Sequence, residues 1–147
     1  MNTRTHRAGQ HQIVEVVSTD IVVKDAQDAL DLMFGTDSSH LVLHEHNFES
    51  SVFDLSSRKL GEILQKFINY RVHLAVIGDF EKYPSKALRD FIHEINRHGD
   101  HLFVSSLDQI INRWSRHDPR REEATGDALP APIVRHNKAA RRLLLDG

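Results

Sequence analysis

The chain has 147 residues, of which 39% are hydrophobic and 27% are charged, and its formal net charge is -2 at pH 7. This composition fits one soluble globular domain, and the small net charge gives no general reason to expect nucleic acid or an acidic membrane surface as a partner. The absence of cysteine excludes a disulfide framework, a thiol nucleophile and a sulfur-ligated zinc site. No signal peptide or membrane helix is expected, and we predict a cytoplasmic protein.

The N-terminal part of the chain predicts one or two strands and a helix. Residues 1–11 are polar and are assigned to an N-terminal tail. Residues 12–17 and 21–23 are rich in β-branched side chains, which favour strands. Asp25 is a suitable N-cap for a helix with apolar residues at helical spacing, and Gly35 is placed to end that helix.

The middle of the chain predicts a strand, a helix and a second strand. Residues 40–44, HLVLH, form a short apolar run. One stripe of the following helix carries the apolar side chains, which are Leu60, Ile63, Leu64, Phe67 and Ile68. Residues 72–77 are apolar on both faces, as expected for a central strand covered by helices, and Asp79 follows them.

A further helix, strand and helix complete the alternating region. Residues 84–99 repeat the helical spacing and end at Gly99, residues 101–104 predict a strand, and Ser106 with Gln109 has the spacing of a capping box. Strands joined by helical crossovers are parallel neighbours. We therefore predict one α/β domain over residues 12–115, with a four- to five-stranded, mainly parallel sheet and helices packed on it.

The remaining residues, 116–147, predict a linker and a short amphipathic helix. The linker is rich in charge and proline, and the helix carries Ala139, Ala140, Leu143 and Leu144 at helical spacing. Such a short helix is marginal in water unless it docks on something. Two interpretations stay open: it docks on its own domain or a twin subunit, or it is a peptide that a partner recognises.

Residues 12–114 resemble the bacterial family catalogued as domain of unknown function 4180. The resemblance is carried by DAQDALDLM, FDLSS, GEILQKFINYRV, AVIGDF, YPSKALRDFIHEINR and FVSSLDQ. It implies no particular activity, because the activity of the family is unknown.

The order of elements is also similar to that of the sulfate-transporter and anti-sigma-factor-antagonist (STAS) domain. In that family a strand leads into a loop of the type Asp-Ser-Ser-Gly-Leu-Gly at a helix start, where a partner kinase phosphorylates one hydroxyl. FDLSSRKLGEIL stands at the corresponding place, and its matching positions are Asp54, Ser56, Ser57, Leu60 and Gly61. This loop is longer, and Arg58 and Lys59 replace the glycine that follows the serines.

The resemblance implies a STAS-like regulatory module that binds a protein partner, with a homodimer among its expected forms. The residues assigned to the partner surface and its switch are Asp54, Ser56, Ser57, Arg58, Lys59, Glu62 and Lys66. The two serines have two open interpretations, either as caps of the following helix or as a phosphorylated or anion-binding switch.

The alternative function is a ligand-binding protein or an unrecognised enzyme. Open α/β sheets bind ligands at the carboxyl ends of their strands, where Asp79 is expected with Lys86 in the next loop. Asp79 also fits a simple turn acid. The site would be formed by the edge around His46, Asp54 and Asp79.

No cofactor, metal or catalytic residue is assigned. The sequence has no glycine-rich phosphate loop, nucleophile elbow or H-E-x-x-H motif. His44 and His46 are weak metal candidates, because they lie on one side if the strand continues but need a third ligand. Basic residues of the C-terminal segment lack accompanying aromatic residues, so nucleic acid is not expected.

Overall fold

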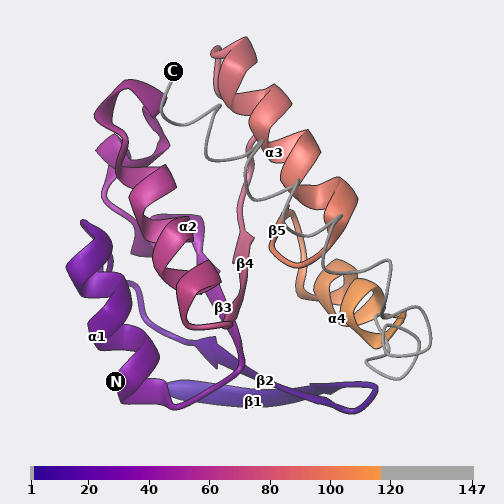
Figure 1. Cartoon of the computed structure of the whole chain (residues 1–147). Coiled ribbons are helices and arrows are strands. Elements are labelled where there is room, and N and C mark those ends of the chain that lie inside the picture. The colour runs from indigo at the N-terminus through magenta and orange to yellow at the C-terminus, as the bar shows by residue number, and fades with distance from the viewer. Residues whose placement is uncertain (1, 117–147) are drawn as a thin grey trace.

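The computed structural model describes residues 2–116, which form a five-stranded sheet and four α-helices (Figure 1). The strands lie in chain order, β1-β2-β3-β4-β5; the first pair is antiparallel and the other three pairs are parallel. The predicted α/β class and mainly parallel sheet are therefore confirmed. Except for Arg116, the predicted C-terminal linker and helix lie outside the described residues.

The sheet begins with a hairpin whose first strand lies in the residues assigned to an N-terminal tail, while its second strand is the one predicted at residues 12–17. Strand β1 (Thr3–Ala8) pairs with β2 (His11–Val16), and the connecting Gly9 has the left-handed φ of 62° that tight hairpin turns require. Most β1 side chains are polar and exposed because this strand forms the edge of the sheet. Residues 21–23 add no further strand; Val23 makes only one isolated bridge, to Phe48.

Helix α1 (Ala26–Thr36) begins as predicted but extends past Gly35, the residue expected to end it. The Asp25 carboxylate accepts the Asp28 N–H at 2.9 Å. The helix continues through Gly35 to Thr36, and its C-cap is Asp37, which has φ 48° and donates its N–H to the Met33 carbonyl at 3.0 Å. Aspartate tolerates this left-handed conformation better than most residues, so glycine is not needed there.

The middle of the chain forms strand β3 (His40–His44), helix α2 (Lys59–Asn69) and strand β4 (His73–Ile77). Three short 3-10 turns, Glu45–Asn47, Ser50–Phe53 and Leu55–Ser57, connect β3 to α2. The predicted apolar stripe of α2 is confirmed: Leu60, Ile63, Leu64 and Phe67 are buried, and Ile68 is partly exposed.

The chain then forms helix α3 (Lys86–His98), strand β5 (Leu102–Val104) and helix α4 (Leu107–Arg116). Gly99 ends α3 with a φ of 83°, as predicted. The capping box of α4 is present in both directions: Ser106 Oγ accepts the Gln109 N–H at 3.3 Å, and Gln109 Oε1 accepts the Ser106 N–H at 3.1 Å.

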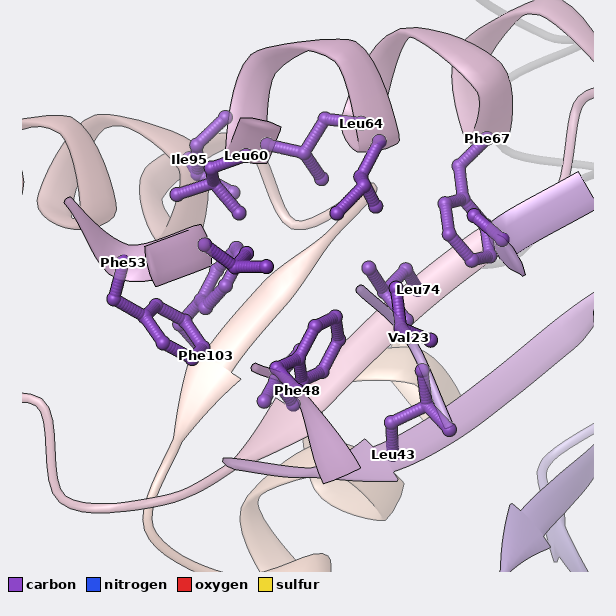
Figure 2. Packing of buried hydrophobic residues seen from close by; sticks show 14 of the residues in the cluster. Val23, Leu43, Phe48, Phe53, Leu60, Leu64, Phe67, Leu74, Ile95 and Phe103 are labelled. Carbon is purple, nitrogen blue, oxygen red and sulfur yellow. The ribbon is translucent and has the colours of Figure 1, made fainter. Parts of the chain in front are cut away.

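Helices cover both faces of the sheet. On one face, α1, α2 and α3 pack on the larger core cluster, and Figure 2 shows Leu64 and Phe67 of α2 on the side of the helix that faces Leu74 of β4, with Leu60 beside Ile95 of α3. On the other face, α4 covers a smaller cluster composed of Ala8, Ile13, Val42, Ala75, Leu102, Ile110 and Trp114. Among the described residues, none of the helices is both long and apolar enough to cross a bilayer.

A row of imidazole rings lies under α4. The rings of His11 and His40 stack at 4.4 Å, as do those of His40 and His73, and Trp114 meets His40 edge-on at 4.9 Å. Trp114 also donates its Nε1 proton to the Gly99 carbonyl at 2.9 Å. Trp114 therefore anchors the last turn of α4 to the sheet and to the end of α3.

The turn between α2 and β4 offers a test of local strain. Arg71 has a φ of 58°, a left-handed conformation that costs a residue with a Cβ roughly 1–2 kcal/mol. Replacing Arg71 by glycine removes this cost but adds backbone entropy to the unfolded chain, so we expect the free energy of unfolding to rise by about 0.5–1 kcal/mol. Urea denaturation measures this change.

The matched control for this variant is Ala87→Gly, at an exposed position inside α3. Its backbone is already helical, so glycine should lower the free energy of unfolding by about 0.5–1 kcal/mol. A loss of stability in both variants would contradict the assignment of strain to Arg71.

Candidate functional site

The carboxyl ends of β3 and β4 bring two polar segments to the same edge of the sheet. Residues 45–58 follow β3, and residues 78–85 follow β4, which is the parallel neighbour of β3. The Phe53 ring contacts the rings of Phe80 and Tyr83, with centroids 5.7 and 5.6 Å apart. The structure therefore joins the serine segment, which the sequence analysis assigned to the partner surface, to the Asp79 segment, which it grouped with His46 and Asp54 at a ligand site.

Asp54 and Ser56 form an exposed turn ahead of α2. The Asp54 carboxylate accepts the Ser56 hydroxyl at 2.7 Å and the Ser56 N–H at 3.0 Å. These two bonds, the hydroxyl first, hold the pKa of Asp54 below its ordinary value. The Ser56 hydroxyl thus lies at the surface, next to a carboxylate that stays ionised.

Ser57 has a different, structural environment. Its half-buried hydroxyl lies 2.8 Å from the Ser51 carbonyl and 2.7 Å from the Asp54 carbonyl, and it accepts the Lys59 N–H at 3.2 Å. These contacts close the loop onto the start of α2. The N-cap of α2 is Arg58, which makes no side-chain cap hydrogen bond, so neither serine is the N-cap of this helix. Ser57 instead closes the loop, and Ser56 has the accessible hydroxyl.

The cations after the serines also differ from each other. Arg58 is exposed and has a left-handed φ of 64°. Lys59 instead bonds back to the preceding turn, because its Nζ lies 3.1 Å from Glu49 Oε1 and 2.9 Å from Ser51 Oγ. The other two residues assigned to the partner surface lie on α2, where Glu62 is exposed and Lys66 is partly exposed.

Glu45 organises the edge between the two strands. It is the first residue after β3, and its side chain is only 15% exposed. Its Oε2 forms an ion pair with Lys82 Nζ at 2.8 Å and accepts the Tyr83 hydroxyl, while its Oε1 accepts the Asp79 N–H at 3.1 Å. Glu45 therefore connects the segment after β3 to the segment after β4.

These contacts determine the protonation of the cluster. Burial by itself would raise the pKa of Glu45, but the bonds from Lys82, Tyr83 and the Asp79 N–H outweigh it and lower that pKa. The pKa of Tyr83 is raised, first by burial and then by its bond to the Glu45 carboxylate. At neutral pH the cluster holds an ionised carboxylate, a protonated phenol and an ammonium group.

Gly78 is required for this arrangement. A Cβ built on Gly78 would lie 2.6 Å from the Glu45 Cβ and 2.7 Å from Glu45 Oε1, which is closer than real Cβ contacts. Asp79 itself is exposed and contributes its backbone N–H to Glu45. Lys86 lies on the α3 surface, where it pairs with Asp90 at 2.7 Å.

A cleft of about 520 Å³ opens beside this cluster. Its lining includes Glu45, His46, Phe48, Phe53, Lys82 and Tyr83. Two residues that the sequence analysis placed at a ligand site, Asp54 and Asp79, are not among the lining residues, whereas His46 is. Sequence reasoning missed Glu45, although the rule that singled out Asp79, an acid directly after a central strand, applies to Glu45 as well.

His44 and His46 are engaged by the protein. His44 Nε2 lies 2.8 Å from Glu15 Oε2, and His46 Nε2 lies 2.8 Å from the Ser18 carbonyl, with the two rings stacked at 5.3 Å. Strand β3 ends at His44, so the two residues do not continue one strand. Within residues 2–116, no group of three or more histidine, cysteine, aspartate or glutamate side chains is arranged to hold a metal ion.

Glu15 was not foreseen as part of this edge. It is buried on β2 and bonds His6 Nε2 through Oε1 and His44 Nε2 through Oε2, both at 2.8 Å. Burial alone would raise the pKa of Glu15, but the two histidine bonds outweigh it and lower that pKa. Glu15 therefore ties β1 and β3 to β2 by its side chain as well as by the sheet.

Comparison with known proteins identifies the family. Residues 8–114 match the family described as Domain of unknown function (DUF4180), and the chain belongs to this family. No curated protein and no solved structure matches the chain. The family resemblance seen in the sequence is therefore confirmed, and the STAS likeness stays a prediction.

The Glu45 cluster predicts a specific loss of stability in acid. Because the pKa of Glu45 is lowered from 4.5 in the folded protein, its contribution to stability is present above that value and is lost as the pH falls through the folded pKa. We expect Glu45→Gln to lower the free energy of unfolding by about 1–2 kcal/mol at pH 7. The difference from the unaltered chain should shrink steadily as the pH falls from about 5 toward 3.

Urea denaturation across this pH range tests the prediction, with Glu81→Gln as the matched control. Glu81 is exposed and lies in the same loop, so its replacement should change stability by less than about 0.5 kcal/mol. A Glu45→Gln difference that is independent of pH would show that the Glu45 charge is not what stabilises this edge.

Proposed function

We propose that this protein is a cytoplasmic, STAS-like regulatory module that binds a partner protein through the Asp54–Arg58 turn and the outer face of α2, without catalysing a reaction. The observation that carries the proposal is the exposed Ser56 hydroxyl, which is bonded to Asp54 directly ahead of α2. This is the place in the element order where the serine loop of STAS domains stands. The linear, mainly parallel sheet with a serine turn between β3 and α2 supports the same assignment.

Phosphorylation of Ser56 would change the conformation of this turn. A phosphoserine carries about two negative charges, which would repel the Asp54 carboxylate that now accepts both the hydroxyl and the N–H of Ser56. Arg58 is two residues away, is exposed, and offers a guanidinium suited to phosphate. The modified turn would exchange its Asp54 contacts for a phosphate–arginine contact, so a partner would meet a different surface in each state.

The partner surface is polar and carries both signs of charge. Glu62 and Lys66 lie one turn apart on the exposed side of α2, while Lys59 is held by Glu49 at the base of the turn. Such a surface suits a reversible interface, in which charged groups at the rim set specificity and association rate. A second copy of this chain is one partner of that kind.

Affinity capture of the full-length chain from a lysate of its native cells tests the proposal. Bound proteins and the phosphate content of Ser56 are measured by mass spectrometry. We expect one stoichiometric partner, at least about tenfold less of it with Ser56→Asp and with the charge-reversed pair Glu62→Lys and Lys66→Glu, and no change with Lys86→Glu. The last variant is the matched control, because it reverses a charge on the exposed surface of α3.

Two outcomes would contradict the proposal. The first is a chain recovered without partner and without phosphate. The second is a partner whose recovery falls as much with Lys86→Glu as with the α2 variants, since that would place the interface elsewhere.

The cleft beside Glu45 favours a second function, the binding of a small ligand. Phe48 and Phe53 supply aromatic surface, while Lys82 and His46 supply polar groups at its rim. A small aromatic acid has matching chemistry, with a ring for the phenylalanines and a carboxylate for Lys82. Benzoate is a simple probe of this kind.

Thermal unfolding of the full chain with millimolar benzoate tests this function. Binding should raise the melting temperature by about 2–4 °C for each kcal/mol of stabilisation, and Lys82→Ala should remove the shift. Lys86→Ala, outside the cleft, should retain it. An equal shift in all three proteins would show that benzoate does not bind through Lys82.

A further inference from the structure

A groove of about 570 Å³ lies between α1 and the N-terminal hairpin. Thr5 of β1 and Val14 of β2, which face each other in register, contribute to its floor. Asp28, Asp31 and Gly35 contribute to its wall from α1. This groove is separate from the Glu45 cleft and from the serine turn, because it shares no lining residue with either.

The groove is open because α1 does not extend over the edge strand. The buried residues of α1 are Ala29, Leu32 and Met33, and they face the sheet and the main core cluster. A Cβ built on Gly35 would meet nothing within 4 Å. The described residues therefore leave apolar surface of Val14 and Val22, which are only partly buried, accessible along one side of α1.

The wall of the groove is acidic. The Asp28 carboxylate accepts the Lys24 N–H at 2.9 Å, and the Asp31 carboxylate accepts the Gln27 amide at 3.0 Å. Neither carboxylate forms an ion pair with a cation within residues 2–116. An occupant with both apolar and positively charged side chains would complement this groove.

The chain leaves the described domain beside the turn of the hairpin, on the opposite face of the sheet from the groove. A Cβ built on Gly9, in the hairpin turn, would lie 3.3 Å from the Ser115 carbonyl oxygen, so α4 ends against the hairpin whose strands form the groove floor. Residues 117–132 can extend to at most about 55 Å, which is ample to cross from one face of the hairpin to the other.

The sequence that follows has the required chemistry. Residues 133–145, IVRHNKAARRLLL, carry four cations, Arg135, Lys138, Arg141 and Arg142, together with an apolar set that recurs at helical spacing. We propose that residues 133–145 bind in this groove of their own chain, with the leucines against Val14 and Val22 and the arginines near Asp28 and Asp31. This docking does not depend on the regulatory function proposed above, because it involves a different surface.

Chemical cross-linking in the full-length chain tests the docking. Because the sequence contains no cysteine, a pair of introduced cysteines is the only thiol pair present. The test pair is Thr5→Cys with Leu144→Cys, and the matched control is Lys86→Cys with Leu144→Cys, which places the first thiol on the exposed surface of α3. A short bis-maleimide is added, and products are resolved by denaturing electrophoresis and mass spectrometry.

We expect the test pair to form an intramolecular cross-link at least about tenfold faster than the control pair, because docking raises the effective concentration of the two thiols. Adding Asp31→Lys to the test pair should reduce the rate to that of the control. A melting curve of each variant verifies that the domain is folded, and Asp31→Asn supplies a milder replacement if the lysine variant is not.

The test distinguishes docking within one chain from docking between two copies and from the absence of docking. Equal rates in the test and control pairs would overturn the proposal. A cross-linked dimer in place of an intramolecular product would also overturn it, and would assign the groove to the C-terminal segment of a second copy.

Discussion

The two central strands, β3 and β4, have to be covered on both faces, and the rest of the structure follows from this requirement. Leu41, Leu43, Leu74 and Val76 face one side of the sheet, while Val42 and Ala75 face the other, and all six are fully buried. Side chains alternate along a strand, so one layer of helices cannot cover both sets. Helices α1, α2 and α3 therefore cover one face, and the chain has to pass to the other face so that α4, anchored by Trp114, covers the second.

The parallel pairing of β3 and β4 also places the polar side chains of the candidate site. In a parallel pair, the carboxyl ends of both strands reach one edge, and the polar backbone there has to be satisfied by the loops that follow. Glu45 does this for β4 by accepting the Asp79 N–H, and Lys82 and Tyr83 compensate for its partial burial. The aromatic residues Phe53 and Phe80 then hold the serine turn against the same edge. The exposed Ser56 thus lies on a turn that packs against this edge, as the proposed recognition surface requires.

The edge strand β1 carries side chains that disfavour pairing with a strand of another molecule. Its exposed side chains are mostly polar, and Arg4 and Arg7 place charge along an edge that would otherwise invite pairing with another strand. The groove beside α1 exists because the helical layer stops short of this strand. The proposed partner surface on α2 and the groove beside α1 are therefore separate consequences of the way three helices cover a five-stranded sheet.

Sequence alone determined the features that depend on neighbouring residues. The helical stripe of α2, the Asp25 cap, the Gly99 terminus and the Ser106–Gln109 capping box were all predictable because their partners lie within about one helical turn. The two-sided apolar character of residues 72–77 likewise predicted a central strand, and with it the parallel sheet.

Only the tertiary structure decided the features whose partners lie far apart in the chain. Strand β1 was missed because the polar residues of an edge strand have the composition of a tail, and only pairing with β2 distinguishes the two. Glu45 meets Tyr83, and Glu15 meets His44, at sequence separations of 38 and 29 residues. The spacing of apolar and polar residues along the sequence does not predict contacts between residues so far apart. They arise because parallel strands bring distant segments to a common edge, where burial makes each charge depend on the partner that the fold supplies.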